Sequence, residues 1–220
     1  MIQVTTRNRP DVLEYSIRNT REHYDGFLII IDDNSETKEA NQRIAKKYDC
    51  AYSYNDKRRG IPLSKERGFR SLLSFDHQIW LDDDCYLRAP IDPIIEAMEY
   101  QGHILYLHEW AHIFEVESVG HGLVRFNSGT ACFMTFRKDM YDDMKGFQAG
   151  FTMYGHWHNI LSRNMAKHGL GEFVSLEGAH DYIHSFDLDG APDDFGQGFS
   201  SCMTSDERRA EIKKSKHWHK

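Results

Sequence analysis

The sequence lacks several features that would place it in a specialised class of protein. None of its apolar runs approaches the ~20 residues that a membrane-spanning helix needs, so we expect no transmembrane segment. No charged leader precedes an apolar run, which makes the cytoplasm the expected location. The four cysteines include no Cys-x-x-Cys pair, so we expect reduced thiols rather than a disulfide framework. The formal charge of -7 argues against binding nucleic acid through overall charge.

The first half of the sequence alternates apolar runs with helix-like segments. The apolar, β-prone runs are residues 2–6, 27–31, 51–54 and 78–81. Helical patterns fill the intervals between them, and the first begins at Pro10. This order predicts an α/β fold with a Rossmann-like, mostly parallel sheet flanked by helices. Further β-prone runs at 104–107, 123–126 and 131–136, and a helical pattern at 159–168, predict a smaller, mixed C-terminal region.

Three adjacent carboxylates follow the apolar run that ends at residue 81. Asp82, Asp83 and Asp84 repel one another and are costly to desolvate unless a cation is present. Mg²⁺ or Mn²⁺ typically takes a few carboxylate ligands together with the phosphates of its substrate. Ligands of open α/β sheets bind outside the carboxyl ends of the strands, where this triplet is expected to lie. The alternative is a solvated acidic turn or a helix N-cap.

A second acidic pair, Asp32 and Asp33, ends the apolar run 27–31. Two acidic clusters should therefore meet at the same edge of the sheet. Carboxylates at this place can accept hydrogen bonds from a ribose or from a base N–H group. Capping of the following helix by Asp33 or Ser35 is the alternative, and capping is compatible with ligand binding.

Three segments carry a resemblance to a known family. They are residues 4–10 (VTTRNRP), 31–35 (IDDNS) and 80–84 (WLDDD). In order and spacing these segments resemble the N-terminal half of GT-A fold glycosyltransferases, especially family 2, over roughly residues 2–95. The resemblance implies a GT-A type fold and a nucleoside diphosphate sugar as donor substrate.

The resemblance also implies roles for individual residues. Asp33 would contact the base of the nucleotide, Arg67 would lie near the base or the diphosphate, and Asp84 would ligate the metal directly. Asp82 and Asp84 would form the acidic pair that holds Mn²⁺ or Mg²⁺. The full set expected to bind the donor is Thr5, Arg7, Asp32, Asp33, Arg67, Asp82 and Asp83.

The C-terminal half resembles the family less closely. Gly146, Phe147 and Arg163 fit the family frame, but residues 154–159 (YGHWHN) stand where an acidic pair usually supplies the catalytic base. Histidines gather in this half, and a neutral imidazole can ligate a metal or act as a general base, although many histidines are structural. The candidates for catalysis are His156, His158 and Asp181. The candidates for further metal ligands are His180 and His184.

Together these features predict a metal-dependent glycosyltransferase that moves a hexose or pentose from a nucleoside diphosphate sugar, with UDP favoured, to a hydroxyl group. Residues 1–100 would bind the donor, residues 101–205 would form the acceptor half of the same domain, and residues 206–220 a basic tail. The favoured acceptor is a glycan or lipid-linked glycan. The basic tail makes DNA with a hydroxymethylated base the alternative acceptor.

Two alternatives to glycosyl transfer stay open. A nucleotidyltransferase can share the fold and an acidic metal site, but it normally has a glycine-rich phosphate loop near the first strand. Residues 5–10 contain no glycine. A nucleotide-sugar-binding module that has lost catalysis is the other alternative, because the usual acidic pair is missing.

Overall fold

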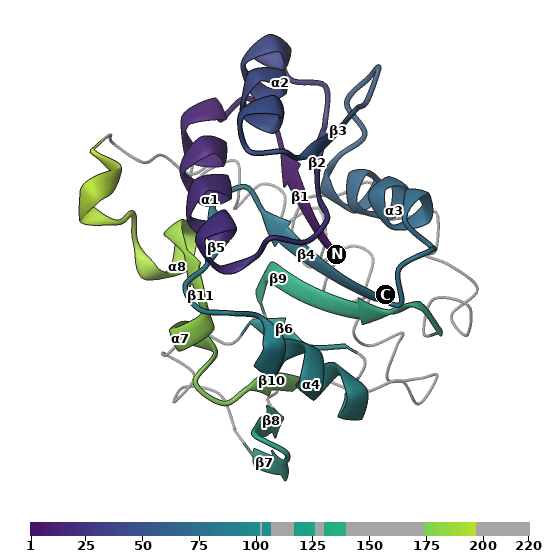
Figure 1. The fold of residues 1–220 in the computed structure, drawn as a ribbon, viewed down its shortest axis with the longest axis vertical. Helices are drawn as coiled ribbons and strands as arrows, with labels where there is room; N and C mark the ends of the chain where they lie inside the picture. Colours follow the sequence, from purple (N-terminus) through teal and green to yellow (C-terminus); the bar gives the residue numbers. More distant parts are fainter. Residues whose placement is uncertain (102, 107–116, 126–129, 140–173, 197–220) are drawn as a thin grey trace, which may run out of the picture.

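A six-stranded sheet forms the centre of the protein in the computed structural model (Figure 1). The structure describes residues 1–101, 103–106, 117–125, 130–139 and 174–196. In spatial order the strands are β3 (Ala51–Tyr54), β2 (Leu28–Asp32), β1 (Ile2–Thr6), β4 (His77–Asp82), β9 (Thr130–Arg137) and β6 (Leu105–Tyr106). The first four strands are parallel to one another, and β9 runs antiparallel to both β4 and β6. The predicted α/β fold with a mostly parallel sheet is confirmed.

Helices cover both faces of this sheet (Figure 1). They are α1 (Pro10–His23), α2 (Lys38–Lys47), α3 (Ile61–Ser71) and α4 (Asp92–Tyr100). Ile2 and Val4 of β1 join the apolar side chains of α1 and α2 in the main core. On the opposite face, Gln3 donates a hydrogen bond from Nε2 to the carbonyl oxygen of Lys65 in α3, at 2.9 Å. The side chains of β1 therefore alternate between two helical layers, as expected of a strand buried on both faces.

α3 approaches β1 closely at Gly68. A Cβ atom at Gly68 would lie 1.9 Å from Oε1 of Gln3, far inside the contact distance of nonbonded atoms. Glycine in a helix interior costs about 1 kcal/mol relative to alanine, so its place in α3 is explained by packing rather than by helix propensity. This approach places the side chain of Lys65 next to the carboxyl end of β4.

The last described segment, residues 174–196, returns to the end of β4. β5 (Cys85–Leu87) pairs antiparallel with β11 (Ile183–Ser185), and the amide of Phe186 donates a hydrogen bond to the carbonyl oxygen of Asp84 at 2.9 Å. The other short elements are β7 (Glu117–Gly120), β8 (Leu123–Arg125), β10 (Val174–Leu176), α7 (Ala179–Tyr182), α8 (Phe186–Asp189) and a 3₁₀ turn at Asp193–Phe195. The sequence pattern did not predict β5 or β11, because three residues are too few to show a period.

Two features bear on the expected class of the protein. No helix within the described ranges is long and apolar enough to cross a membrane. Cys50, Cys85 and Cys132 have free thiols. The helix expected at 159–168, Cys202 and the basic tail lie outside the described residues.

A buried histidine in the β9 region gives the fold a specific pH dependence. His103 is fully buried beside Phe136, and its Nδ1 lies 2.9 Å from the carbonyl oxygen of Thr135. Burial lowers the pKa of its imidazole from 6.5 to about 4, although the hydrogen bond to Thr135 opposes this shift. Between these two values the unfolded chain binds the proton and the folded chain does not. The free energy of unfolding should therefore fall by about 3 kcal/mol as the pH falls through this window.

Urea unfolding of the wild type and of His103→Gln near pH 7 and near pH 4 measures this effect. The variant should lose this part of the pH dependence, whereas His180→Gln, at an exposed histidine, should keep it. If the stability of wild type and His103→Gln changes equally with pH, His103 is not a buried neutral imidazole.

Candidate nucleotide and metal site

The loops that follow β1, β2 and β4 meet at the carboxyl edge of the sheet. Thr6 of β1 is the register partner of Asp32, and Thr5 is the register partner of Asp82. Both acidic clusters therefore lie beside the end of β1, at the edge where open α/β sheets bind their ligands. The structure agrees with the expectation that the two clusters share one edge.

Asp83 joins the loop after β1 to the loop after β4. Its Oδ2 accepts a hydrogen bond from the hydroxyl of Thr6 at 2.7 Å and one from Nε of Arg9 at 3.3 Å. A second guanidinium nitrogen of Arg9 pairs with Oδ1 of the same carboxylate. Asp83 is almost fully buried, and both of its carboxylate oxygens are engaged in these contacts with Thr6 and Arg9. The middle aspartate of the triplet therefore fixes the geometry of the site.

Asp84 pairs with Arg9 among the described residues, and its pKa is strongly raised. Nη1 of Arg9 lies 3.1 Å from its Oδ2, and the side chain is 6% exposed. Burial raises the pKa of Asp84 to about 7; Arg9 opposes this shift, and the negative charges of Asp83, Asp82 and Asp187 add to it. A carboxylate that is buried among other carboxylates is poorly compensated by one guanidinium, and a second cation would stabilise its ionised form.

Asp82 is paired with a lysine that the sequence analysis did not single out. Nζ of Lys65 lies 2.7 Å from Oδ1 of Asp82; the lysine side chain is fully buried and the aspartate side chain is 25% exposed. Burial raises the pKa of Asp82, whereas the charges of Lys65 and Arg9 oppose the shift. The sequence did contain a signal for this contact, because Lys65 precedes the buried Gly68 and Phe69 by three and four residues. That spacing puts Lys65 on the buried face of the helix.

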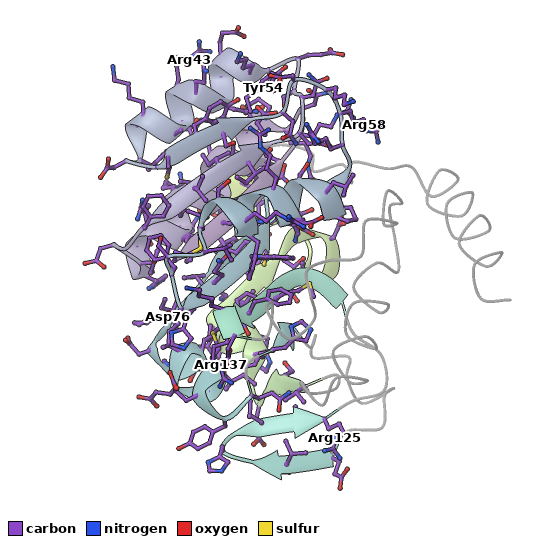
Figure 2. The ribbon with its side chains drawn as sticks, turned by 90° about the vertical axis from the view of Figure 1, so that its right-hand side faces the viewer. Arg43, Tyr54, Arg58, Asp76, Arg125 and Arg137 are labelled. Carbon is purple, nitrogen blue, oxygen red and sulfur yellow. The ribbon has the colours of Figure 1, made fainter. Side chains whose placement is uncertain are left out.

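Asp33 organises the loop between β3 and α3. Its Oδ1 accepts hydrogen bonds from Nδ2 of Asn55 at 3.0 Å and from the amide of Arg59 at 2.8 Å, and its Oδ2 accepts one from the amide of Gly60 at 2.8 Å. The suggested capping by Asp33 or Ser35 is wrong, because α2 begins at Lys38 after Thr37 and has no side-chain cap. Figure 2 shows Tyr54, the last residue of β3, and Arg58, within this loop, at one end of the molecule.

Asp32 is fully buried and has a complete set of protein partners. It accepts hydrogen bonds from the amide of Ser35 at 2.8 Å, from Nδ2 of Asn41 at 2.8 Å and from the hydroxyl of Tyr52 at 2.6 Å. Burial and this carboxylate raise the pKa of Tyr52 well above its usual range, so the tyrosine remains a donor. These contacts tie β2 to α2 and β3.

Two asparagines shape the loops around these acids. Asn8 and Asn34 have φ angles of 57° and 62°, in the left-handed region that asparagine tolerates better than most residues. The amide of Asn8 donates to Oγ of Ser35 at 3.0 Å, and its Oδ1 accepts from the amide of Glu36 at 2.7 Å. The loops after β1 and β2 are thereby held against each other.

Three further candidates lie near this edge. The hydroxyl of Thr5 is buried and has no hydrogen-bond partner within the described part of the chain. Nε of Arg7 is also buried without such a partner among the described residues. Arg67 donates from Nη1 to the carbonyl oxygen of Tyr54 at 2.9 Å and also contacts Oδ1 of Asn55. Polar groups that stay unpaired inside a protein are costly, and a bound ligand would relieve that cost.

The described C-terminal candidates, His180, Asp181 and His184, have their contacts with residues outside the aspartate triplet. Nε2 of His184 lies 2.9 Å from the carbonyl oxygen of Gly190, and its ring lies 5.0 Å from that of Tyr86. His180 and Asp181 lie 3.6 Å apart with exposed side chains. Across the described ranges, no three histidine, cysteine or acidic side chains are grouped as a ready metal site. His156, His158, Gly146, Phe147 and Arg163 lie outside the described residues.

The acidic residues nevertheless fit a hard divalent ion that arrives with its own ligands. Asp82 and Asp84 supply carboxylate oxygens, and burial raises the pKa of both, so a cation that replaces a proton stabilises them as anions. Mg²⁺ and Mn²⁺ sites at phosphates commonly use one or two carboxylates together with phosphate oxygens and water. The absence of a third grouped side chain is therefore compatible with this type of site.

Comparison with known proteins gives matches in structure only. No protein-family model matches the sequence, and no curated protein matches it significantly. GalNAc-T7, crystallised with UDP, GalNAc and Mn²⁺, is similar with a TM-score of 0.67 at 10% identity, over 86% of this chain and 44% of that one. TarS from S. aureus in complex with UDP gives 0.58 at 11%, over 83% and 58% of the two chains.

A third similar structure has nearly the same extent as this protein. HddC from Yersinia pseudotuberculosis, complexed with GMP-PN, has a TM-score of 0.57 at 9% identity, over 89% of this chain and 96% of that one. By contrast, this chain spans 44% of GalNAc-T7 and 58% of the TarS chain. The parallel sheet and its flanking helices are thus those of the GT-A fold, which this chain shares with these structures.

Proposed function

We propose that the protein is a metal-dependent glycosyltransferase that uses a nucleoside diphosphate sugar, with UDP as the favoured nucleotide. The observation that carries this proposal is the position of Asp82 and Asp84, two buried or half-buried carboxylates beside the end of β1. The similar structures of GalNAc-T7 and TarS, both determined with UDP, support the choice of nucleotide.

Each residue at the sheet edge has a part in this proposal. Asp84 and Asp82 would hold Mn²⁺ or Mg²⁺, and the bound ion would offset the charge that develops on the departing diphosphate. Arg7 and Thr5 have buried polar atoms that would pair with the donor. Arg67 would lie near the base or the diphosphate. Asp32 would support the site without contacting the donor, because its hydrogen bonds with Asn41 and Tyr52 hold the loop after β2 in place.

The acceptor is the less specific part of the proposal. Residues 1–100 would bind the donor, and residues 101–205 would bind a glycan or lipid-linked glycan whose hydroxyl attacks the sugar. His156, His158 and Asp181 remain the candidates for a general base, and His180 and His184 remain candidates for extra metal ligands. A DNA acceptor held by residues 206–220 is the alternative, and strong salt dependence of DNA binding would favour it.

Asp33 gives a prediction about the nucleoside. Its three hydrogen bonds shape residues 55–60, so it would position this loop against the base or exchange one of the loop donors for a base N–H group. Loss of a charge-assisted hydrogen bond costs roughly 1.5–3 kcal/mol, so Asp33→Ala should weaken UDP binding about tenfold or more. Calorimetric titration with UDP measures this. Equal affinity in Asp33→Ala and wild type would remove Asp33 from the site.

Thermal unfolding with a panel of nucleotides tests the proposed function. UDP or a UDP-sugar with Mn²⁺ should stabilise the protein, by about 2.7 kcal/mol at ~100 times Kd, and EDTA should abolish most of the effect. Stabilisation by no nucleoside diphosphate, with or without Mn²⁺, would contradict the proposal.

A guanine nucleotide is the second candidate, because the similar HddC structure holds GMP-PN and matches nearly its full length. The panel therefore includes GDP, GTP and a sugar 1-phosphate. Preferential stabilisation by GDP would change the proposed base. Formation of pyrophosphate from a nucleoside triphosphate and a sugar phosphate would instead identify a nucleotidyltransferase. Hydrolysis or transfer of a donor sugar would exclude a module that only binds.

A further inference from the structure

Two internal cations accompany the aspartate triplet and reach it from different elements. Arg9, in the loop after β1, contacts Asp83 with two nitrogens and Asp84 with a third, at 3.1 Å in the latter case. Lys65 reaches Asp82 from α3, at 2.7 Å. The guanidinium side chain is 15% exposed and the lysine side chain is fully buried, so water screens neither charge effectively. Both cations are therefore part of the electrostatics of the proposed metal site.

We propose that Arg9 and Lys65 make metal binding depend on the donor: they offset two of the three carboxylate charges, so that a divalent ion binds well only together with the nucleotide diphosphate. This inference rests on the proposed function. It assigns these two residues a role in the order of binding, in addition to their structural contacts.

The charges of the cluster explain why the metal and the nucleotide would bind together. When Asp82, Asp83 and Asp84 are all ionised, as metal binding requires, these three carboxylates and the two cations together carry one net negative charge. A divalent ion added alone would make the cluster net positive, and it would lie near a largely buried guanidinium and a fully buried ammonium group, both of which repel it. The diphosphate brings several negative charges and supplies further oxygen ligands, so metal and nucleotide should each favour the binding of the other.

The ion pairs with Arg9 and Lys65 also involve only one oxygen each of Asp84 and Asp82. Nη1 of Arg9 contacts Oδ2 of Asp84, and Nζ of Lys65 contacts Oδ1 of Asp82. Each ion pair therefore occupies one of the two oxygens of the carboxylate. The two contacts of Arg9 to Asp83 keep the guanidinium in place even if its contact to Asp84 is lost. The site is therefore preformed without metal, and the cations are not displaced as a precondition of binding.

Measurement of free Mn²⁺ by electron paramagnetic resonance, with and without UDP, tests this inference. In the wild type, UDP should lower the Kd for Mn²⁺ at least about tenfold. Arg9→Met removes one cation and should tighten the binding of Mn²⁺ alone by about tenfold or more, which reduces the effect of UDP. Arg9→Lys keeps the charge and should resemble the wild type. Arg18→Met, at an exposed arginine that pairs with Asp194, is the matched control and should change nothing.

A purely positional role for Arg9 gives the opposite result. In that case Arg9→Met and Arg9→Lys would both weaken Mn²⁺ binding, because neither side chain reproduces the fork to Asp83 and Asp84, and the inference would be wrong. Lys65→Met is the second variant and should also tighten the binding of Mn²⁺ alone; circular dichroism checks that each variant is folded. Tight binding of Mn²⁺ to the wild type without UDP would equally overturn the inference.

The same binding measurement distinguishes failure of the proposed function from failure of this inference. If neither UDP nor GDP binds to the wild type with Mn²⁺, the proposed function fails and the inference fails with it. If UDP and Mn²⁺ both bind to the wild type but independently of each other, the proposed function stands and only the inference is overturned.

Discussion

Asp84→Asn should lower the affinity for UDP in the presence of Mn²⁺ at least about a hundredfold and should abolish transfer, because the amide replaces a charged metal ligand by a neutral one. The substitution should not lower the stability of the fold. Burial holds the pKa of Asp84 at about 7, above its ordinary value of 3.8, so ionisation of this group between these values costs folding free energy. The asparagine carries no charge and avoids that cost. In EDTA near pH 8 the variant should therefore be at least as stable as the wild type.

Calorimetry with UDP and Mn²⁺, together with thermal unfolding in EDTA, measures both parts of this result. Asp76→Asn is a suitable control, because Asp76 (labelled in Figure 2) is an exposed residue directly before the amino end of β4, whereas the triplet lies at the carboxyl end of that strand. Unchanged affinity in Asp84→Asn would show that Asp84 is not a metal ligand. A large loss of stability in EDTA would show that its charge supports the fold.

The second large effect concerns stability. Lys65→Met should destabilise the protein by about 3 kcal/mol, because it leaves the charge of Asp82 without the ammonium group that lies 2.7 Å away. The estimate is at the low end of the range for broken buried pairs, since the side chain of Asp82 is 25% exposed and keeps some hydration. Lys65→Met combined with Asp82→Asn removes both charges and should recover most of the loss.

Urea unfolding of the single and double variants at neutral pH gives these free energies. Lys47→Met is the control, because Lys47 forms an exposed pair with Glu14 and should change the stability by less than about 1 kcal/mol. A loss as small in Lys65→Met as in Lys47→Met would mean that the buried pair does not stabilise the fold.

The parts of the fold that the sequence predicted are those with a local pattern. The apolar run at 27–31 and the proline at the first turn of α1 identify their elements, and the strand expected at 51–54 has the same bounds in the structure. Runs that end in aspartate gave the position of the acidic edge. Those features depend on neighbouring residues, so periodicity and turn chemistry are enough to find them.

The parts that the sequence did not predict depend on contacts between distant residues. Arg9 meets Asp83 across 74 positions, and β11 pairs with β5 across nearly half the chain. Lys65 lies among polar residues in the sequence, and its helical spacing from Gly68 and Phe69 is the one local sign that it faces inward. Its contact with Asp82 depends on the close packing of α3 on β1. Asp33 could have capped α2, but α2 begins only at Lys38, and Asp33 accepts hydrogen bonds from residues 55–60 instead. Tertiary packing determines all of these contacts, and local pattern carries little information about it.

A crystal structure with UDP and Mn²⁺, with anomalous diffraction used to locate the manganese, tests the central claim most directly. We expect one anomalous peak at about 2.0–2.2 Å from a carboxylate oxygen of Asp84 and in contact with the diphosphate. The uracil should then lie against residues 55–60. Manganese bound away from the aspartate triplet, or UDP bound away from the carboxyl ends of β1, β2 and β4, would contradict the proposed site.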